Sequence, residues 1–308
     1  MNGALGSGED RFIAALRSIA ADPAARGLFD DAAELPVGAG SLVLTHDMMV
    51  EGVHWLPEQD AADVAWKLVA VNLSDLAAKG ARPVALLLGY TLGSDAWDMR
   101  FAKGLAEAVA AFDAPLLGGD TVSAPAGSAR AVGLTAIGTP RKTPAPSRSD
   151  ARAGESLWVT GTIGAALAGF EALQKGDAGP ASLPYRRPVP LIGEGQALAA
   201  AAGAMMDISD GLLLDAQRMA QASGVTIAID SAAVPLAPAV SERAMEAMSW
   251  GDDYQLLFTL AAGALPPIAA TRIGTVAAPA DGPILLDGRV PPASTALGYR
   301  HASPAPRA

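Results

Sequence analysis

The 308-residue chain contains no cysteine, only three histidines and few aromatic residues. Without cysteine there is no disulfide, thiolate zinc site, iron–sulfur cluster or cysteine nucleophile, which suits a reducing compartment. The net charge of −10 and the aromatic content of 5% argue against nucleic-acid binding, which favours basic patches and stacking platforms. No run approaches the ~20 apolar residues that span a bilayer, and the acidic start lacks the pattern of a secretory signal. We therefore expect a cytoplasmic protein that binds neither nucleic acid nor membrane.

Apolar segments with strand-like and helix-like periods alternate along the chain, which predicts an α/β (α+β) fold. The expected strands are 41–45, 84–92, 114–117, 130–138, 225–230 and 255–260, with a strand, turn and helix start over 157–164. The expected helices are 9–21, 61–80, 96–112, 195–206 and 212–222. The stretch 139–156 is rich in Pro, Ser and charge, so it is interpreted as a linker. We expect one domain over 1–140, a second over 141–308, and a disordered tail after 301.

Several aspartates stand among small residues at the ends of apolar segments. They are Asp30, Asp31, Asp47, Asp75, Asp120, Asp207 and Asp210. Each alone fits a turn or cap, and Asp75 and Asp210 each precede a helical stretch as an N-cap would. As a set they cost desolvation unless a cation collects them. Oxygen-only ligands suit Mg²⁺, Mn²⁺ or Ca²⁺, and Mg²⁺ is commonly held by carboxylates together with substrate phosphates.

Phosphate-binding signals are present in an unusual form. There is no Walker A sequence and no protein-kinase motif set. Gly118 and Gly119 precede Asp120 and allow a ligand to approach the backbone closely. The segment 161–164 (GTIG) joins a strand to a helix, where a helix N-terminus can hold an anion. Phosphoryl transfer therefore needs a family other than the P-loop or protein kinases.

Several motifs together resemble the thiamine-monophosphate kinase family, within the superfamily of aminoimidazole ribonucleotide synthetase. They are THDMMVEGVHW (45–55), WKLVAVNLSDLAAKGARP (66–83), LLGGDT (116–121), YRRPVP (185–190), MDISDGLLLD (206–215), GDDYQLLF (251–258) and LGYRH (297–301). The resemblance covers about residues 8 to 301. It implies two α/β domains, a homodimer formed through the N-terminal domain, and ATP with several Mg²⁺ ions in the cleft between the domains. It also implies transfer of the ATP γ-phosphoryl group to thiamine monophosphate.

The resemblance carries roles onto positions of this chain. Metal ligands would be Asp30, Thr45, Asp47, Asp75, Asp120, Asp207 and Asp210, and catalysis would depend on Asp30, Asp47, Asp120 and Asp210. ATP would contact Gly119, Asp120, Arg148 and Ser209, and thiamine monophosphate would contact His54, Asp252 and Tyr299. The residues also permit plainer roles: Arg148 as a solvated loop charge, His54 and Tyr299 as core residues, and Asp252 as a turn residue.

Phosphoryl transfer to a phosphate acceptor fits a site that is rich in aspartate and has no obvious general base. The acceptor oxygen of a phosphate is already ionised near neutral pH, so no general base is needed. Catalysis then depends on positioning and on neutralising charge between two polyanions.

Four positions depart from the family pattern. They are Phe29 in place of Gly, His46 in place of a small hydroxyl residue, and Asp252 and Gln255 in place of two Glu residues. They leave two alternatives open. One is a catalytically degenerate protein that binds nucleotide or thiamine phosphate, and the other is a different ATP-dependent member of the superfamily. The absence of cysteine separates the chain from the cysteine-using relatives, selenophosphate synthetase and the hydrogenase-maturation protein.

Overall fold

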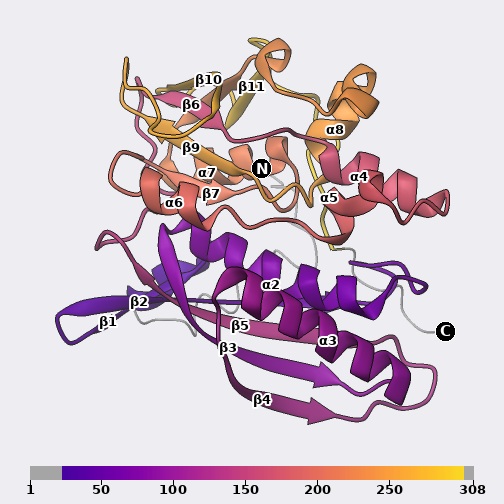
Figure 1. The fold of residues 1–308 in the computed structure, drawn as a ribbon. Helices are drawn as coiled ribbons and strands as arrows, with labels where there is room; N and C mark the ends of the chain where they lie inside the picture. The colour runs from indigo at the N-terminus through magenta and orange to yellow at the C-terminus, as the bar shows by residue number, and fades with distance from the viewer. Residues whose placement is uncertain (1–22, 302–308) are drawn as a thin grey trace, which may run out of the picture.

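A computed structural model describes residues 23–301 and shows two halves, each built on one mixed β-sheet (Figure 1). The helix expected at 9–21 and the tail after 301 lie outside the described residues. Within them, the expected α/β architecture is confirmed.

The first half is a five-stranded sheet covered by two long helices. Its elements are β1 (Ala33–Val37), β2 (Gly40–Val50), α2 (Ala61–Ala78), β3 (Ala81–Thr91), α3 (Asp95–Phe112), β4 (Leu116–Val122) and β5 (Ala131–Pro140), preceded by a 3₁₀ segment, Pro23–Leu28. The strand order is β1-β2-β5-β3-β4, antiparallel except for the β3–β4 pair. Both helices lie on the same face of this sheet (Figure 1), so among residues 23–301 no helix covers the opposite face.

The second half is a six-stranded sheet with shorter helices. Its elements are β6 (Ser156–Val159), α4 (Ala165–Gln174), α5 (Leu183–Arg186), α6 (Ile192–Leu198), β7 (Met205–Asp207), α7 (Leu212–Ser223), β8 (Thr226–Ile229), α8 (Ala244–Trp250), β9 (Leu256–Leu260), β10 (Thr271–Ala277) and β11 (Ile284–Leu286). Short 3₁₀ segments cover Pro180–Ser182, Ser231–Ala233 and Pro238–Arg243. The strand order is β11-β8-β10-β6-β9-β7, with only β8 and β11 parallel.

Helix α2 lies between the two halves (Figure 1). It packs on β2, β3 and β5 of the first sheet and also contacts α6 and β7 of the second half. Every residue of α2 except Trp66 is buried, which is expected of a helix surrounded by protein. The backbone of α6 approaches closely because residue 195 is glycine: a Cβ there would lie 2.0 Å from the Ala77 carbonyl oxygen. Polar residues on α2 are therefore held at the junction of the halves.

Two expected elements differ from the structure. The strand expected at 114–117 is β4, which runs to Val122, so the glycine pair and Asp120 lie within the strand and do not follow it. The helix expected over 195–206 ends at Leu198, and Met205–Asp207 is instead strand β7, paired with β9. Met205 and Met206 are fully buried in the second half, so the packing of β9 determines their conformation.

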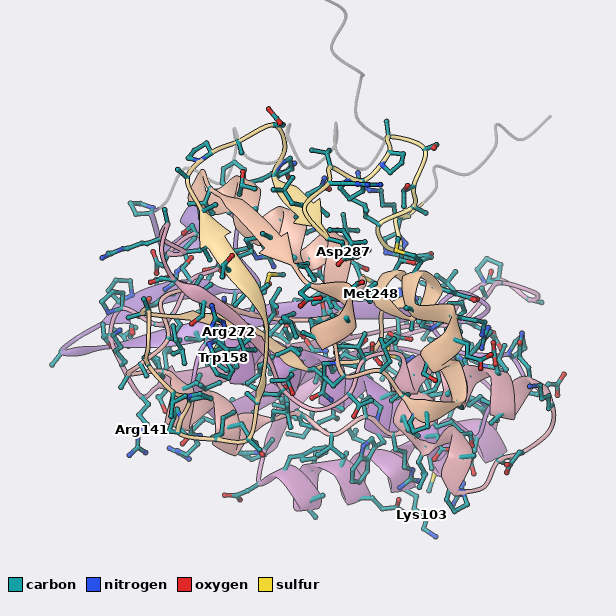
Figure 2. All side chains as sticks on the ribbon, turned by 90° about the horizontal axis from the view of Figure 1, so that it is seen from above. Lys103, Arg141, Trp158, Met248, Arg272 and Asp287 are labelled. Atoms are coloured by element: carbon teal, nitrogen blue, oxygen red, sulfur yellow. The ribbon has the colours of Figure 1, made fainter. Side chains whose placement is uncertain are left out.

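Side chains divide clearly between interior and surface (Figure 2). Met248 lies in the core of the second half, whereas Lys103 on α3 and Arg141 after β5 extend from the surface. No helix in the described part of the chain combines the length and apolar character needed to cross a bilayer.

Candidate functional site

A cavity of about 480 Å³ lies between the two halves, and α2 forms part of its wall. One end is lined by carboxylates, which come from both halves of the chain: Asp31, Asp47, Asp75, Asp207 and Asp210. The other end is lined by His54, Tyr185, Asp252, Tyr299 and His301. The cavity thus brings together predicted site residues that are more than 200 positions apart in the chain, such as Asp47 and Asp252.

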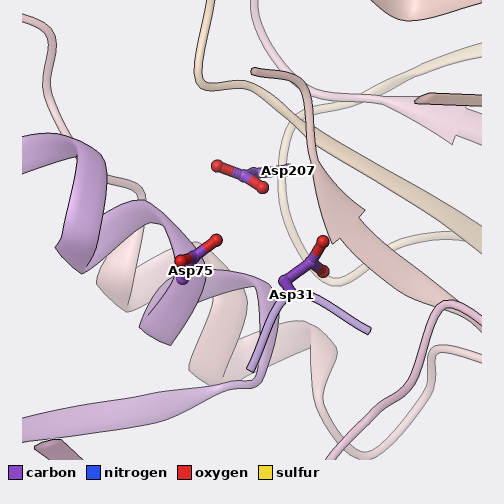
Figure 3. A group of neighbouring side chains, drawn as sticks. All are labelled: Asp31, Asp75 and Asp207. Carbon is purple, nitrogen blue, oxygen red and sulfur yellow. The ribbon is translucent and has the colours of Figure 1, made fainter. Parts of the chain in front are cut away.

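Three carboxylates converge at the acidic end (Figure 3). Asp75 projects from α2, Asp207 ends β7, and Asp31 lies just before β1. Each offers an oxygen atom within 4.8 Å of an oxygen of the other two. We call these three residues the carboxylate group. Its donors are all oxygen atoms, and its spacing fits a divalent hard cation such as Mg²⁺.

The electrostatics of this end favour a cation. Burial, together with the charges of Asp47 and Asp207, raises the pKa of Asp75 well above its usual range. Burial and the charges of Asp207 and Asp210 raise the pKa of Asp47 to about 7. Burial also raises the pKa of Asp207, although Ser74 Oγ donates to it at 2.6 Å. Carboxylates that repel one another in this way are stabilised by a bound metal ion.

Asp30, which the sequence favoured, is engaged by protein cations. Its carboxylate lies 2.5 Å from Arg26 Nη1 and 2.5 Å from Lys79 Nζ. Burial alone would raise the pKa of Asp30, but Lys79 and Arg26 lower it to about 2. Asp31 contacts Lys79 Nζ at 2.8 Å and Arg148, yet also belongs to the carboxylate group. Both aspartates therefore contact protein cations, and Asp31 differs from Asp30 in that one of its oxygens also lies within 4.8 Å of oxygens of Asp75 and Asp207.

Thr45 and Asp47 lie beside the carboxylate group on β2. The Thr45 hydroxyl donates to Asp75 and is buried. The Asn72 side chain on α2 accepts from the Asp47 backbone N–H at 2.9 Å. These contacts fix β2 against α2, so that Asp47 faces the cavity.

The loop after β7 presents Ser209 and Asp210. The fully buried Asp215 carboxylate accepts from the backbone N–H groups of Ser209 at 3.1 Å and Asp210 at 3.0 Å. Arg218 Nη1 then bridges Asp210 at 2.5 Å and Asp215 at 2.9 Å. Asp210 therefore does not cap α7, and Asp75 lies inside α2 rather than before it. The cap interpretation fails for both.

Gly119 and Asp120 do not reach this cavity within one chain. Register places Met48, Gly133, Gly89 and Asp120 side by side across β2, β5, β3 and β4, so they share one face of the sheet. Asp47, next to Met48, points to the opposite face, toward α2. Asp120 instead lines a second cavity with His46 and Met48, and Met48 also lines the first.

The second end of the cavity holds the residues expected to bind the acceptor. The backbone N–H of Val50 donates to His54 Nδ1 at 2.9 Å, so the neutral ring carries its proton on Nε2. Burial lowers the pKa of His54, although the Asp252 charge opposes this. Asp252 Oδ1 accepts from the Tyr254 hydroxyl at 2.9 Å. Tyr299 is 43% exposed at the margin, so it is not a core aromatic.

Arg148 is largely enclosed rather than solvated. Its side chain is 15% exposed, and its guanidinium contacts Asp31 and approaches Asp30 to 3.9 Å. It lines the cavity beside the carboxylate group.

Several functional candidates were missed from the sequence. The missed residues are Lys67 on α2 and Lys79, the residue that caps its C-terminus; both fall in a four-residue spacing with Val71 and the predicted Asp75, so neighbouring members lie close together on the helix. Two lysines in an otherwise apolar predicted helix could have indicated that buried cations have carboxylate partners. Asp215 carried no comparable signal, because its role depends on the fold of the preceding loop.

Comparisons with known proteins were made for both halves. The family description "AIR synthase related protein, N-terminal domain" matches residues 29–139, and "AIR synthase related protein, C-terminal domain" matches 152–278. The thiamine-monophosphate kinase of Caulobacter vibrioides is 41% identical over 254 residues, which cover 77% of this chain and 71% of that protein. The thiamine-monophosphate kinase of Escherichia coli K12 is 38% identical over 251 residues, covering 76% of each.

Solved structures show the same arrangement. A structure described as AaThiL complexed with AMPPCP and TMP has a TM-score of 0.82 and 30% identity, covering 92% of this chain and 95% of that one. The thiamine-monophosphate kinase from Stenotrophomonas maltophilia K279a has a TM-score of 0.72 and 32% identity, covering 94% and 98%.

Proposed function

Because the chain belongs to the AIR synthase related family, and within it to the thiamine-monophosphate kinases, we propose that it phosphorylates thiamine monophosphate with ATP, giving thiamine diphosphate and ADP. The solved relative that holds AMPPCP and TMP supports both substrates. The observation that carries the proposal is the cavity itself, which joins a carboxylate end to an end lined by His54, Asp252 and Tyr299.

We propose that the carboxylate end holds Mg²⁺ with the phosphates of ATP. The carboxylate group would supply metal ligands, with Thr45, Asp47 and Asp210 beside it. Bound Mg²⁺ would neutralise the repulsion between the donor phosphates and the anionic acceptor.

The protein's own groups position the reactants. Arg148 lies next to Asp31 and offers a planar guanidinium suited to phosphate oxygens. The loop at Ser209 is held by Asp215, which accepts from the Ser209 backbone N–H and so keeps Ser209 at the cavity wall. His54, with its proton on Nε2, can donate to a phosphate of the acceptor. No residue needs to remove a proton, because the acceptor oxygen is already ionised.

Two of the four departures, Gln255 and His46, lie away from the cavity, which weakens the degenerate-binder alternative, whereas Asp252 lines the acceptor end. Gln255 accepts from Thr160 Oγ1 at 2.9 Å, in the second sheet, and does not line the cavity. His46 faces the outer side of the first sheet, where its Nδ1 lies 2.9 Å from Thr135 Oγ1. Neither substitution alters the carboxylate group.

A coupled assay for ADP release tests the proposal. With thiamine monophosphate, ATP and Mg²⁺ present, we expect turnover that disappears when Mg²⁺ is chelated. Binding of both ligands without turnover would support the degenerate binder instead. Turnover with aminoimidazole precursors in place of thiamine monophosphate would indicate another member of the superfamily.

We further propose a homodimer formed through the uncovered face of the first sheet. Strand β4 lies at the sheet edge with all seven residues exposed, and Met48, Leu87 and Leu117 are 57%, 41% and 68% exposed. An edge strand with apolar neighbours invites pairing with another chain. Sedimentation velocity would test this: the wild type should be a dimer and Leu117→Arg a monomer.

A dimer would also give Gly119 and Asp120 a role. Asp120 lies on the uncovered face, Gly119 precedes it on the edge strand β4, and neither lines the cavity of its own chain. We propose that they contribute to ATP binding only in the assembled dimer, so that Leu117→Arg should raise the KM for ATP.

We also retain the domain boundary near residue 140, between β5 and β6, and a cytoplasmic location as proposals.

A further inference from the structure

A buried lysine lies behind the acceptor end of the cavity. Lys67, on α2, is 1% exposed. Lysine is almost never fully buried unless it is paired, and an unpaired buried ammonium would be costly. Its partners therefore identify what the ammonium group is for.

The partners of Lys67 are two of the residues expected to bind the acceptor. Its Nζ donates to Asp252 Oδ2 at 2.7 Å and to the His54 carbonyl oxygen at 3.0 Å. The ammonium also lies 3.9 Å from the centre of the Tyr185 ring. The Tyr185 hydroxyl donates to the same His54 carbonyl at 3.2 Å. Lys67 thus joins a loop of the first half to two segments of the second half.

The segment that carries Asp252 needs such support. Asp252 has φ 59° and Tyr254 has φ 50°, values in the left-handed region that non-glycine residues adopt at a cost. Backbone bonds from Asp252 N to the Ser209 carbonyl at 2.7 Å and from Tyr254 N to the Ile208 carbonyl at 2.8 Å hold the turn. They fix the main chain, whereas Lys67 and the Tyr254 hydroxyl fix the two carboxylate oxygens of Asp252.

Lys67 is not among the described residues that line the cavity. We propose that Lys67 is a positioning residue for the acceptor, which orients the Asp252 carboxylate and the His54 main chain so that thiamine monophosphate fits. The proposal rests on the function proposed above. Asp252 is one methylene shorter than the Glu of the family pattern, so its carboxylate reaches less far into the cavity. Contact with a ligand therefore depends more strongly on how the Asp252 carboxylate is oriented. ATP is expected at the other end, so its binding should not depend on Lys67.

Isothermal titration calorimetry tests this with thiamine monophosphate and AMPPCP as separate probes. For Lys67→Met we expect the Kd for thiamine monophosphate to rise at least tenfold, while that for AMPPCP stays within twofold. Lys67→Gln, which keeps a donor for the His54 carbonyl, should fall between Met and wild type. Lys103→Met, a matched change on the exposed surface of α3 (Figure 2), should leave both values unchanged.

A double variant separates positioning from folding. Lys67→Met leaves the Asp252 carboxylate without its cation, which can destabilise the fold, so Asp252→Asn and the double variant Lys67→Met/Asp252→Asn are measured too. If Lys67 acts through Asp252, Lys67→Met weakens binding far less in the Asp252→Asn background than in the wild type, and the loss that remains there measures the contact with the His54 carbonyl. Equal weakening of both probes, or a change under twofold for thiamine monophosphate, would overturn the inference.

The binding measurements on Lys67 can fail independently of the proposed kinase function. A wild-type protein that binds thiamine monophosphate without turnover would refute the kinase function, and the Kd ratio would still decide the role of Lys67. A wild type that does not bind thiamine monophosphate would refute both.

Discussion

Replacing Lys79 by Met should test the charge balance of the acidic end directly. Lys79 is fully buried, and its Nζ contacts Asp30 at 2.5 Å, Asp31 at 2.8 Å and the Met205 carbonyl at 3.2 Å. Methionine nearly matches its length but carries no charge. The substitution therefore leaves two buried carboxylates with fewer cations rather than a large cavity.

The magnitude can be worked in two ways. Removing one partner of a buried ion pair costs roughly 3–5 kcal/mol. The pKa of Asp30 falls from 3.8 to about 2 against the opposing effect of burial, and at ~1.36 kcal/mol per unit this corresponds to roughly 2 kcal/mol. Arg26 still pairs with Asp30 at 2.5 Å in the variant, which reduces the loss of stability. Asp31 also loses its contact with Lys79, which increases it. We expect Lys79→Met to lower the free energy of unfolding by about 3 kcal/mol at pH 7.

Urea unfolding with EDTA present is the assay, with Lys103→Met as the surface control, expected within ~0.5 kcal/mol of wild type. The depressed pKa of Asp30 stabilises the wild type above about pH 4, and this contribution is lost as the pH falls toward 2. The gap between wild type and Lys79→Met should therefore narrow below pH 4. A loss under about 1 kcal/mol at pH 7, or a gap that stays constant, would refute the reasoning.

Three further predictions follow from the same structure. Asp210→Asn should abolish ADP release while the melting temperature stays nearly constant, because it breaks only a partly exposed ion pair with Arg218; a large loss of stability would contradict this. Asp253 accepts from the N–H groups of Gly164 and Ala166, and burial raises its pKa from 3.8 to about 7. Its contribution to the free energy of unfolding is full below pH 4 and lost as the pH rises through 7. Asparagine does not ionise, so between pH 4 and pH 7 the stability of Asp253→Asn relative to wild type should increase by up to about 4 kcal/mol, measured by urea unfolding. Gly195→Ala should cost roughly 1–3 kcal/mol in the same assay, because its Cβ would meet the α2 backbone; unchanged stability would mean that α6 shifts freely.

The sequence by itself determined the family and the α/β class, and it predicted residues that the structure brings to one cavity. Periodicity placed α2, α3 and α7 to within a few residues, because the packing of each helix requires a regular apolar pattern. The motifs around Asp47, Asp75, Asp207 and Asp210 marked the acidic end, since polar residues at the ends of apolar segments stand out in a sequence.

Only the tertiary structure decided which of these residues meet. Asp30 and Asp31 are neighbours in the chain and both contact Lys79, yet only Asp31 joins the carboxylate group, while Asp30 also binds Arg26. Asp47 and Asp120 lie on opposite faces of one sheet, because strand register, which motif spacing does not specify, sets the direction of each side chain. Lys67 likewise acquired its partners only through the packing of α2 between the two halves, where a buried charge must find its counter-charge across 185 residues of sequence.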